Sequence, residues 1–202
     1  MGAFRKSVGL FVSCSLLLAS CKSLTDPSVP EPSSGGTYFS TAQFLTDQIM
    51  MLQGKIYTLE KIIELNGQRD STIVALPTEN WAPVYAAFLN ADIGSTRLLG
   101  KYRFSEFEDP MTLTHSYVYE ADEPNLPVRR LMISANLETH RIKSFLAEVE
   151  TNSFWNSNRR KLYYAPLKVI QIQEWNTPLV GSAKTFRAEY RFLVNQDDNL
   201  AE

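Results

Sequence analysis

The hydrophobic pattern of this chain changes its period near residue 94, and this change constrains the fold more than any other feature. Before it, apolar residues recur with helical spacing in two stretches on either side of a short hairpin; after it, apolar and polar residues alternate almost to the end. Alternation places every second side chain on one face of a sheet. Helices followed by a run of strands predict an α+β fold, in which an N-terminal helix, a short hairpin and a second helix pack on an antiparallel β-meander sheet.

The first helix is indicated by Leu45, Ile49 and Leu52, which recur at 4-3 spacing behind a capping Ser40 or Thr41. This stripe predicts a helix near 41–57. The same stripe continued to Leu59 and Ile63 would form a coiled-coil seam. We favour a hairpin near 58–76 instead.

The hairpin prediction depends on Asn66-Gly67, because both residues tolerate the positive φ of a type I′ turn. The second helix begins after Asn80, with Pro83 in its first turn, and ends near 92–94. Its residues Trp81, Phe88 and Leu89 are expected to pack on the sheet.

Seven strands are expected after the helices. An acidic loop at 106–110 should end the first of them, and turns or short loops separate the others. The predicted strands are 99–104, 112–121, 128–135, 141–149, 161–165, 167–174 and 185–193.

The first 21 residues have the pattern of a lipoprotein signal. Arg5 and Lys6 precede an apolar run at 8–19, which is shorter than the roughly 20 residues a membrane-spanning helix needs. The run ends in Leu18-Ala19-Ser20-Cys21, which resembles the signal peptidase II recognition sequence. We therefore expect cleavage of residues 1–20 and attachment of acyl chains such as palmitate to Cys21. An ordinary secretory signal is the alternative.

The predicted anchor divides the chain into four parts: the signal peptide 1–20, a lipidated Cys and flexible Ser/Pro/Gly tether at 21–36, one α+β domain at 37–194, and a disordered tail at 195–202. Lys22 follows the cysteine, and in the enterobacterial sorting pattern a residue other than Asp there implies the outer membrane. The membrane is thus the first expected partner, with the domain on the periplasmic side.

Composition excludes several classes of function. Cys14 and Cys21 are the only cysteines, so the cleaved domain would have no thiol for a disulfide, a nucleophile or a metal. Removal of Arg5 and Lys6 leaves 18 basic against 22 acidic residues, a net charge of −4. This acidic balance argues against nucleic acid as a partner.

Several short segments resemble a group of small lipoproteins of Bacteroidetes bacteria. They are Asn80-Trp81, Phe88-Leu89-Asn90-Ala91-Asp92-Ile93, Gly100-Lys101-Tyr102 and Leu162-Tyr163-Tyr164, and the likeness spans 59–193. That group tends to have Asn-Lys-Pro where this chain has Gly94-Ser95-Thr96. No function is established for the group, so the resemblance implies a fold and a compartment only.

No catalytic constellation is evident in the sequence. His115 and His140 are the only histidines, and neither belongs to a hydrolase or zinc motif. The acidic residues at 106–109 and 122–123 lack the order of a calcium loop. The basic clusters 129–130 and 159–161 could meet lipid phosphates, but we favour cations that protect sheet edges. We expect no catalytic, cofactor-binding or metal-binding residue and no cofactor.

Two hypotheses for function follow. The first is a non-enzymatic binding or accessory module for an envelope protein partner. The second is a half-barrel carrier of an apolar ligand or lipid, with Phe88, Tyr117 and Phe145 lining its cavity. An enzyme is a third hypothesis, because a pair of catalytic carboxylates has no sequence signature.

Overall fold

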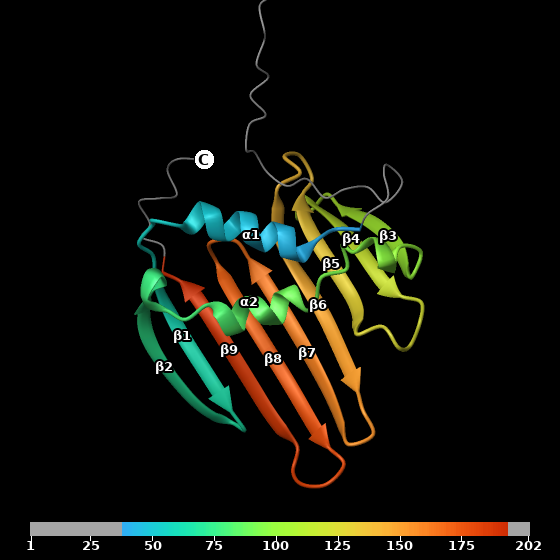
Figure 1. Ribbon diagram of the computed structural model, residues 1–202. Helices are drawn as coiled ribbons and strands as arrows, with labels where there is room; N and C mark the ends of the chain where they lie inside the picture. The colour runs from blue at the N-terminus through green and yellow to red at the C-terminus, as the bar shows by residue number, and fades with distance from the viewer. Residues whose placement is uncertain (1–37, 194–202) are drawn as a thin grey trace, which may run out of the picture.

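The structure of this protein, a computed structural model, describes residues 38–193 and contains one antiparallel sheet with two α-helices (Figure 1). The helices are α1 (Thr41–Leu52) and α2 (Ala82–Leu89), with 3-10 turns at Leu76–Thr78 and Thr96–Leu98. The strands are β1 (Thr58–Leu65), β2 (Gln68–Ala75), β3 (Tyr102–Asp109), β4 (Thr114–Ala121), β5 (Val128–Asn136), β6 (Ile142–Asn152), β7 (Asn156–Ala165), β8 (Val169–Pro178) and β9 (Lys184–Phe192). The α+β class predicted from the change of period is confirmed. The predicted signal peptide, Cys21, the tether and the C-terminal tail lie outside the described residues.

The sheet has the order β2-β1-β9-β8-β7-β6-β5-β4-β3. Strands β3 to β9 form a meander of sequential neighbours, as the alternation predicted. The N-terminal hairpin joins the same sheet, because β1 pairs with β9 from Leu59 opposite Phe192 to Leu65 opposite Phe186. The first and last strands of the described chain are therefore neighbours, and β2 and β3 form the two edges.

The hairpin turn has the predicted conformation. Asn66 and Gly67 both have positive φ, of 50° and 84°, and β1 and β2 pair directly on either side of them.

Helix α1 ends five residues earlier than expected, because Gly54 adopts a φ of 77° just beyond it. A left-handed glycine after the last helical turn ends a helix. Ile56, which continued the apolar stripe, is exposed.

Both helices contribute aromatic rings to the core. Phe44 of α1 meets Phe145 and Tyr164 of the sheet edge to face, at centroid distances of 5.9 and 5.8 Å. Phe88 of α2 meets the same Phe145 at 5.6 Å. In Figure 1 both helices lie in front of the sheet, and the lower part of the central strands extends beyond α2. The core therefore occupies only the upper part of this face, which we call the helix-covered face.

The stripe predicted for α2 is correct for Phe88 and wrong for Leu89. Phe88 and Val84, four residues apart, are buried, whereas Leu89 is 48 % exposed. Successive helical residues point about 100° apart, so only one of Phe88 and Leu89 faces the sheet directly. Trp81 is partly buried, stacks on Tyr85 and lies 4.9 Å from the Tyr190 ring.

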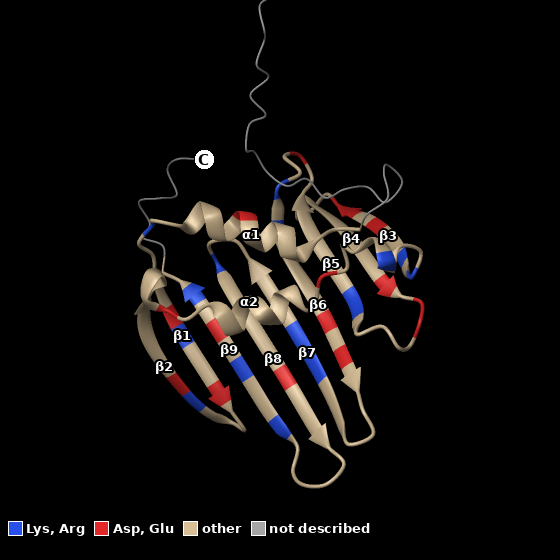
Figure 2. Cartoon of the chain, in the orientation of Figure 1, with Lys and Arg blue, Asp and Glu red and all other residues tan. Residues whose placement is uncertain are grey.

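Two predictions about charged segments are wrong. The acidic residues at 106–109 belong to β3 instead of a loop, and charges on an edge strand discourage pairing with another chain. The basic clusters 129–130 and 159–161 lie on β5 and β7, which are interior strands, so they do not protect an edge. Figure 2 shows charged residues over the lower part of the central strands, below α2.

Candidate functional site

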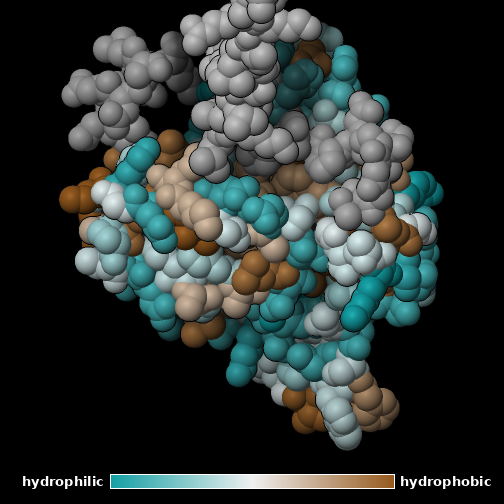
Figure 3. Space-filling model, turned by 45° about the horizontal axis from the view of Figure 1, so that its top comes forward, coloured by the Kyte–Doolittle hydropathy of each residue, from teal (hydrophilic) through white to brown (hydrophobic). Residues whose placement is uncertain are grey.

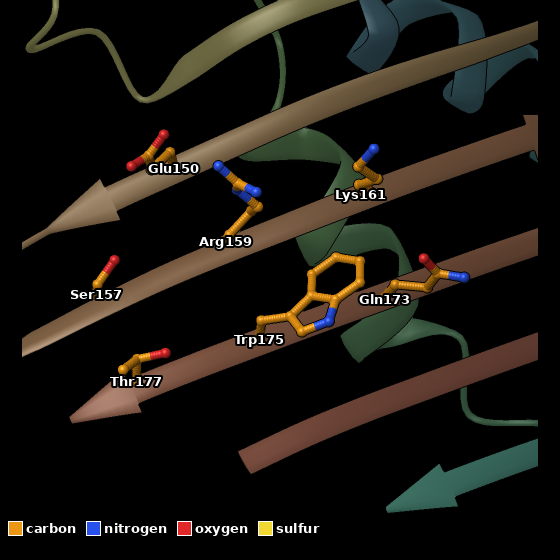
Figure 4. Close-up of a pocket in the computed structure, with 7 residues that line it drawn as sticks. All are labelled: Glu150, Ser157, Arg159, Lys161, Gln173, Trp175 and Thr177. Carbon is orange, nitrogen blue, oxygen red and sulfur yellow. The ribbon is translucent and has the colours of Figure 1, made fainter. Parts of the chain in front are cut away.

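The face of the sheet opposite the helices, here called the open face, carries a groove centred on Trp175. The groove has a volume of about 590 Å³ and crosses β6, β7 and β8. Along β7 and β8, the residues that line the groove alternate with buried residues such as Leu162 and Ile172, which point toward the helices. The lining residues are Glu150, Ser157, Arg159, Lys161, Gln173, Trp175 and Thr177 (Figure 4).

Trp175 is positioned by the register of the central strands. Arg159 of β7 lies directly opposite Trp175 of β8 on one side and opposite Glu150 of β6 on the other. Opposed residues of an antiparallel pair share a face and lie about 5 Å apart at Cβ. Figure 4 shows the indole between Arg159 and Gln173, and Trp175 remains partly exposed. The result is an aromatic surface surrounded by hydrogen-bonding groups.

The charged residues of the groove differ in their partners. Lys161 Nζ lies 2.9 Å from a carboxylate oxygen of Glu148. Glu150 accepts a hydrogen bond of 3.0 Å from the amide of Asn152. The exposed guanidinium of Arg159 has no ion-pair partner within residues 38–193. The guanidinium of Arg159 and the other carboxylate oxygen of Glu150 are therefore available to bind a polar ligand beside the indole.

A second, smaller groove extends the first toward the N-terminal hairpin. It has a volume of about 270 Å³, shares Gln173 and Trp175 with the first, and adds Glu64, Thr185 and Arg187. The indole thus stands where the two grooves meet. Together they are lined by residues of β6, β7, β8, β9 and β1.

Arg187 is held in place by a buried carboxylate. The Glu189 side chain is 5 % exposed and lies between Arg187, at 2.5 Å, and Arg191. Burial alone would raise the pKa of Glu189, but the hydrogen bonds from both arginines outweigh it and hold the pKa below its ordinary value. The carboxylate is thus ionised and fixes one wall of the second groove.

The helix-covered face has a separate cleft beside α2, with a volume of about 660 Å³. Apolar residues of α2, β1, β8 and β9 line it, and two ion pairs stand at its margins. Lys61 lies 2.7 Å from Glu79, and this hydrogen bond raises the pKa of Lys61. Arg160 lies 3.1 Å from Glu174, which also accepts from Asn158. The apolar lining consists of Ile63, Pro83, Val84, Ala86, Ala87, Ile172, Phe186 and Ala188.

The three residues predicted to line an apolar cavity are not gathered around one. Phe88 and Phe145 touch each other in the core, and Phe145 also stacks on Tyr164 at 5.7 Å. Tyr117 lies two strands from Phe145 and stacks on His115 and Phe104. A ligand between Phe88 and Phe145 would have to separate rings that are already in contact. The cleft beside α2 is lined by other residues.

The histidines and acidic clusters form no metal centre in the described part of the chain. His115 lies between Glu106 and Glu108 of β3, at 3.3 and 3.7 Å. His140 occupies a left-handed turn with a φ of 57°. Among residues 38–193, no group of three or more His, Cys, Asp or Glu side chains is arranged to hold a metal ion. In the same residues, no helix has the length and hydrophobicity needed to span a membrane.

Sequence reasoning missed the Trp175 groove, although a signal was present. Gln171, Gln173, Trp175 and Thr177 occur at every second position of one strand, so a tryptophan stands on a polar face. An isolated aromatic on a polar strand face is not part of an apolar core stripe. Comparisons of the whole chain with family models, curated proteins and solved structures found no match.

Proposed function

We propose that this protein is a non-enzymatic binding module of the cell envelope, held at the outer membrane by the lipid predicted on Cys21, and that it binds an oligosaccharide along the Trp175 grooves. One observation carries the ligand class: a partly exposed indole lies at the junction of two polar grooves on the face of the sheet that the helices leave free. The helices pack on the other face, so the grooves are open along their length.

The chemistry of the groove matches that of a sugar. The C–H groups on one face of a pyranose ring pack against an aromatic ring, whereas its hydroxyl groups need both donors and acceptors at the margin. Arg159, Lys161 and Gln173 supply donors, and Glu150 supplies acceptors. Basic and acidic groups are mixed along both grooves, which favours a largely neutral glycan over a polyanion.

The test is calorimetric titration of the protein with soluble oligosaccharides of neutral hexoses, N-acetylated hexosamines and uronic acids. We expect binding to at least one class, and Trp175→Ala should weaken it by roughly tenfold or more, since truncation of a tryptophan that anchors a binding surface costs on the order of 2 kcal/mol or more. Trp155→Ala removes an exposed tryptophan outside the groove and serves as the matched control. Absence of binding across all three classes, or equal affinity of wild type and Trp175→Ala, would refute the proposal.

A second candidate function is transport of an apolar ligand, and the cleft beside α2 favours it. The cleft volume of about 660 Å³ lies in the range of small-molecule sites, and its lining is mostly aliphatic with polar groups at the margin. Such a carrier would use Ile63, Ile172 and Phe186 in place of Phe88, Tyr117 and Phe145. We rank it second because both ion pairs of the cleft are already satisfied within the protein.

A further inference from the structure

Two neighbouring hairpin loops present exposed apolar side chains at one end of the sheet. Phe154 and Trp155 occupy the β6–β7 turn, and Leu179 and Val180 occupy the β8–β9 loop; all four are between 62 and 83 % exposed. We call these four residues the apolar tip. In Figure 1 the two loops lie side by side at the lower end of the sheet, away from α1. Figure 3 shows hydrophobic surface at this protruding lower end.

Hydrogen bonds close the first loop of the apolar tip and join it to the second. The Ser153 and Asn156 backbones close the turn with hydrogen bonds of 2.8 and 3.4 Å, and the Ser153 hydroxyl also bonds to Asn156. The amide of Leu179 donates to the carbonyl of Trp155 at 2.8 Å, which fastens one loop to the other. The Phe154 and Trp155 rings meet edge to face at 4.8 Å. Little further ordering is needed when the tip binds, so its exposure is not a consequence of a loose loop.

The two loops that form the apolar tip carry almost no charge. Residues 151–158 carry no charge, and residues 176–185 carry only Lys184, although the whole chain is acidic. Asn, Ser and Thr surround the four apolar side chains, and a tryptophan between apolar and polar groups is typical of the membrane–water interface. A protruding tip enters a fluid bilayer without a matching cavity, whereas a protein partner would have to supply one.

We propose that the apolar tip inserts into the interfacial region of a lipid bilayer. The tip is then a second membrane contact, additional to the anchor predicted at Cys21, and it orients the domain. This proposal is independent of glycan binding, because Phe154, Trp155, Leu179 and Val180 do not line the Trp175 grooves.

The test uses the full chain reconstituted in vesicles of phosphatidylethanolamine and phosphatidylglycerol whose acyl chains are either plain or brominated. Bromine quenches only those tryptophans that reach the acyl chains. We expect brominated lipid to quench the tryptophan fluorescence of the wild type and of Trp175→Phe to a similar extent. The fluorescence of Trp155→Phe should be quenched much less. The double variant Phe154→Ser/Leu179→Ser should reduce it severalfold. All four altered side chains of these variants are at least partly exposed, and urea unfolding verifies that each variant folds.

Three results would overturn the proposal. One is equal fluorescence in plain and brominated vesicles, which would place Trp155 outside the bilayer. A second is quenching that persists in Trp155→Phe, which would assign the contact to another part of the chain. Shielding of Trp155 that depends on protein concentration instead of lipid would identify a second copy of the chain as the occupant, and would also count against insertion.

Discussion

At the scale of single residues, Glu189 is the buried carboxylate of the open face, and hydrogen bonds from two arginines lower its pKa. Its carboxylate is buried between Arg187 and Arg191, and Arg191 also reaches Glu60 at 3.4 Å. Removing the carboxylate would take away the ion-pair partner of Arg187 and would leave Arg191 with Glu60 alone. The three residues share one strand at every second position, so their alternation was visible in the sequence. The burial of Glu189 was not, because it depends on neighbours from β1 and β8.

We expect the stability supplied by Glu189 to depend on pH. Its folded pKa lies below the unfolded value of about 4.3, so its contribution is complete above that value and is lost as the pH falls through the folded pKa. The urea midpoint of the wild type should therefore fall below about pH 5 more steeply than that of Glu189→Gln. Near pH 7 the variant should be less stable by roughly 1–3 kcal/mol, the cost of lost hydrogen bonds to charged groups.

The control for this prediction is Glu138→Gln, which alters an exposed carboxylate in the β5–β6 turn. It should keep the pH profile of the wild type. Parallel profiles for the wild type and Glu189→Gln would show that the two arginines do not stabilise the ionised carboxylate.

At the scale of elements, the sequence predicted local features better than distant ones. The Asn66-Gly67 turn and the alternating strands follow from conformational preferences of neighbouring residues, and the structure confirms both. The end of α1 and the extent of β3 depended on weaker signals. Gly54 alone ends the helix, and the alternation of Glu106 and Glu108 with Phe107 identifies a strand despite its charge. The alternation in 159–161 likewise separates Arg159 and Lys161 from Arg160.

Helix α2 separates the two candidate functions, because it contributes to both the core and the cleft. Phe88 is fully buried against Phe145 and Tyr164, so Phe88→Ala should lower the free energy of unfolding by about 3–5 kcal/mol. A binding module should show this loss without taking up an apolar dye. If the protein is a carrier, the wild type should bind the dye. Ala87→Phe places a ring in the cleft and should then reduce dye binding.

The matched control is Ala82→Phe, an equal change at an exposed position of α2 that does not line the cleft. Dye binding that survives Ala82→Phe but not Ala87→Phe would support the carrier over the glycan-binding module. A loss of less than about 1 kcal/mol for Phe88→Ala, together with altered dye binding, would show that the core around Phe88 already contains space for a ligand.

At the scale of the whole molecule, the hairpin and the meander form one sheet because β1 pairs with β9. Leu59 lies opposite Phe192, and the Asn66 side chain accepts a hydrogen bond of 3.0 Å from the amide of Thr185. Such distant pairings leave no periodic signal in a single sequence, so the hairpin and the meander were predicted without their connection. For the same reason the full lining of the Trp175 grooves could not be predicted, although the polar strand face around Trp175 was visible in the sequence: Glu64 and Glu150 reach the grooves only through strand order.

The anchor predicted at Cys21 would hold this protein at a membrane, and Cys21→Ala tests that prediction directly. The wild type should incorporate a radiolabelled fatty acid and sediment with membranes, because two or more acyl chains hold a protein almost permanently. The variant should incorporate no label and move mainly to the soluble envelope fraction.

The apolar tip would retain a small, washable fraction on the membrane, comparable to the marginal binding that a single acyl chain provides. Adding Phe154→Ser and Leu179→Ser to Cys21→Ala should release that fraction. A wild type without label, together with a Cys21→Ala variant that stays bound after washing, would show that residues other than Cys21 hold the protein at the membrane.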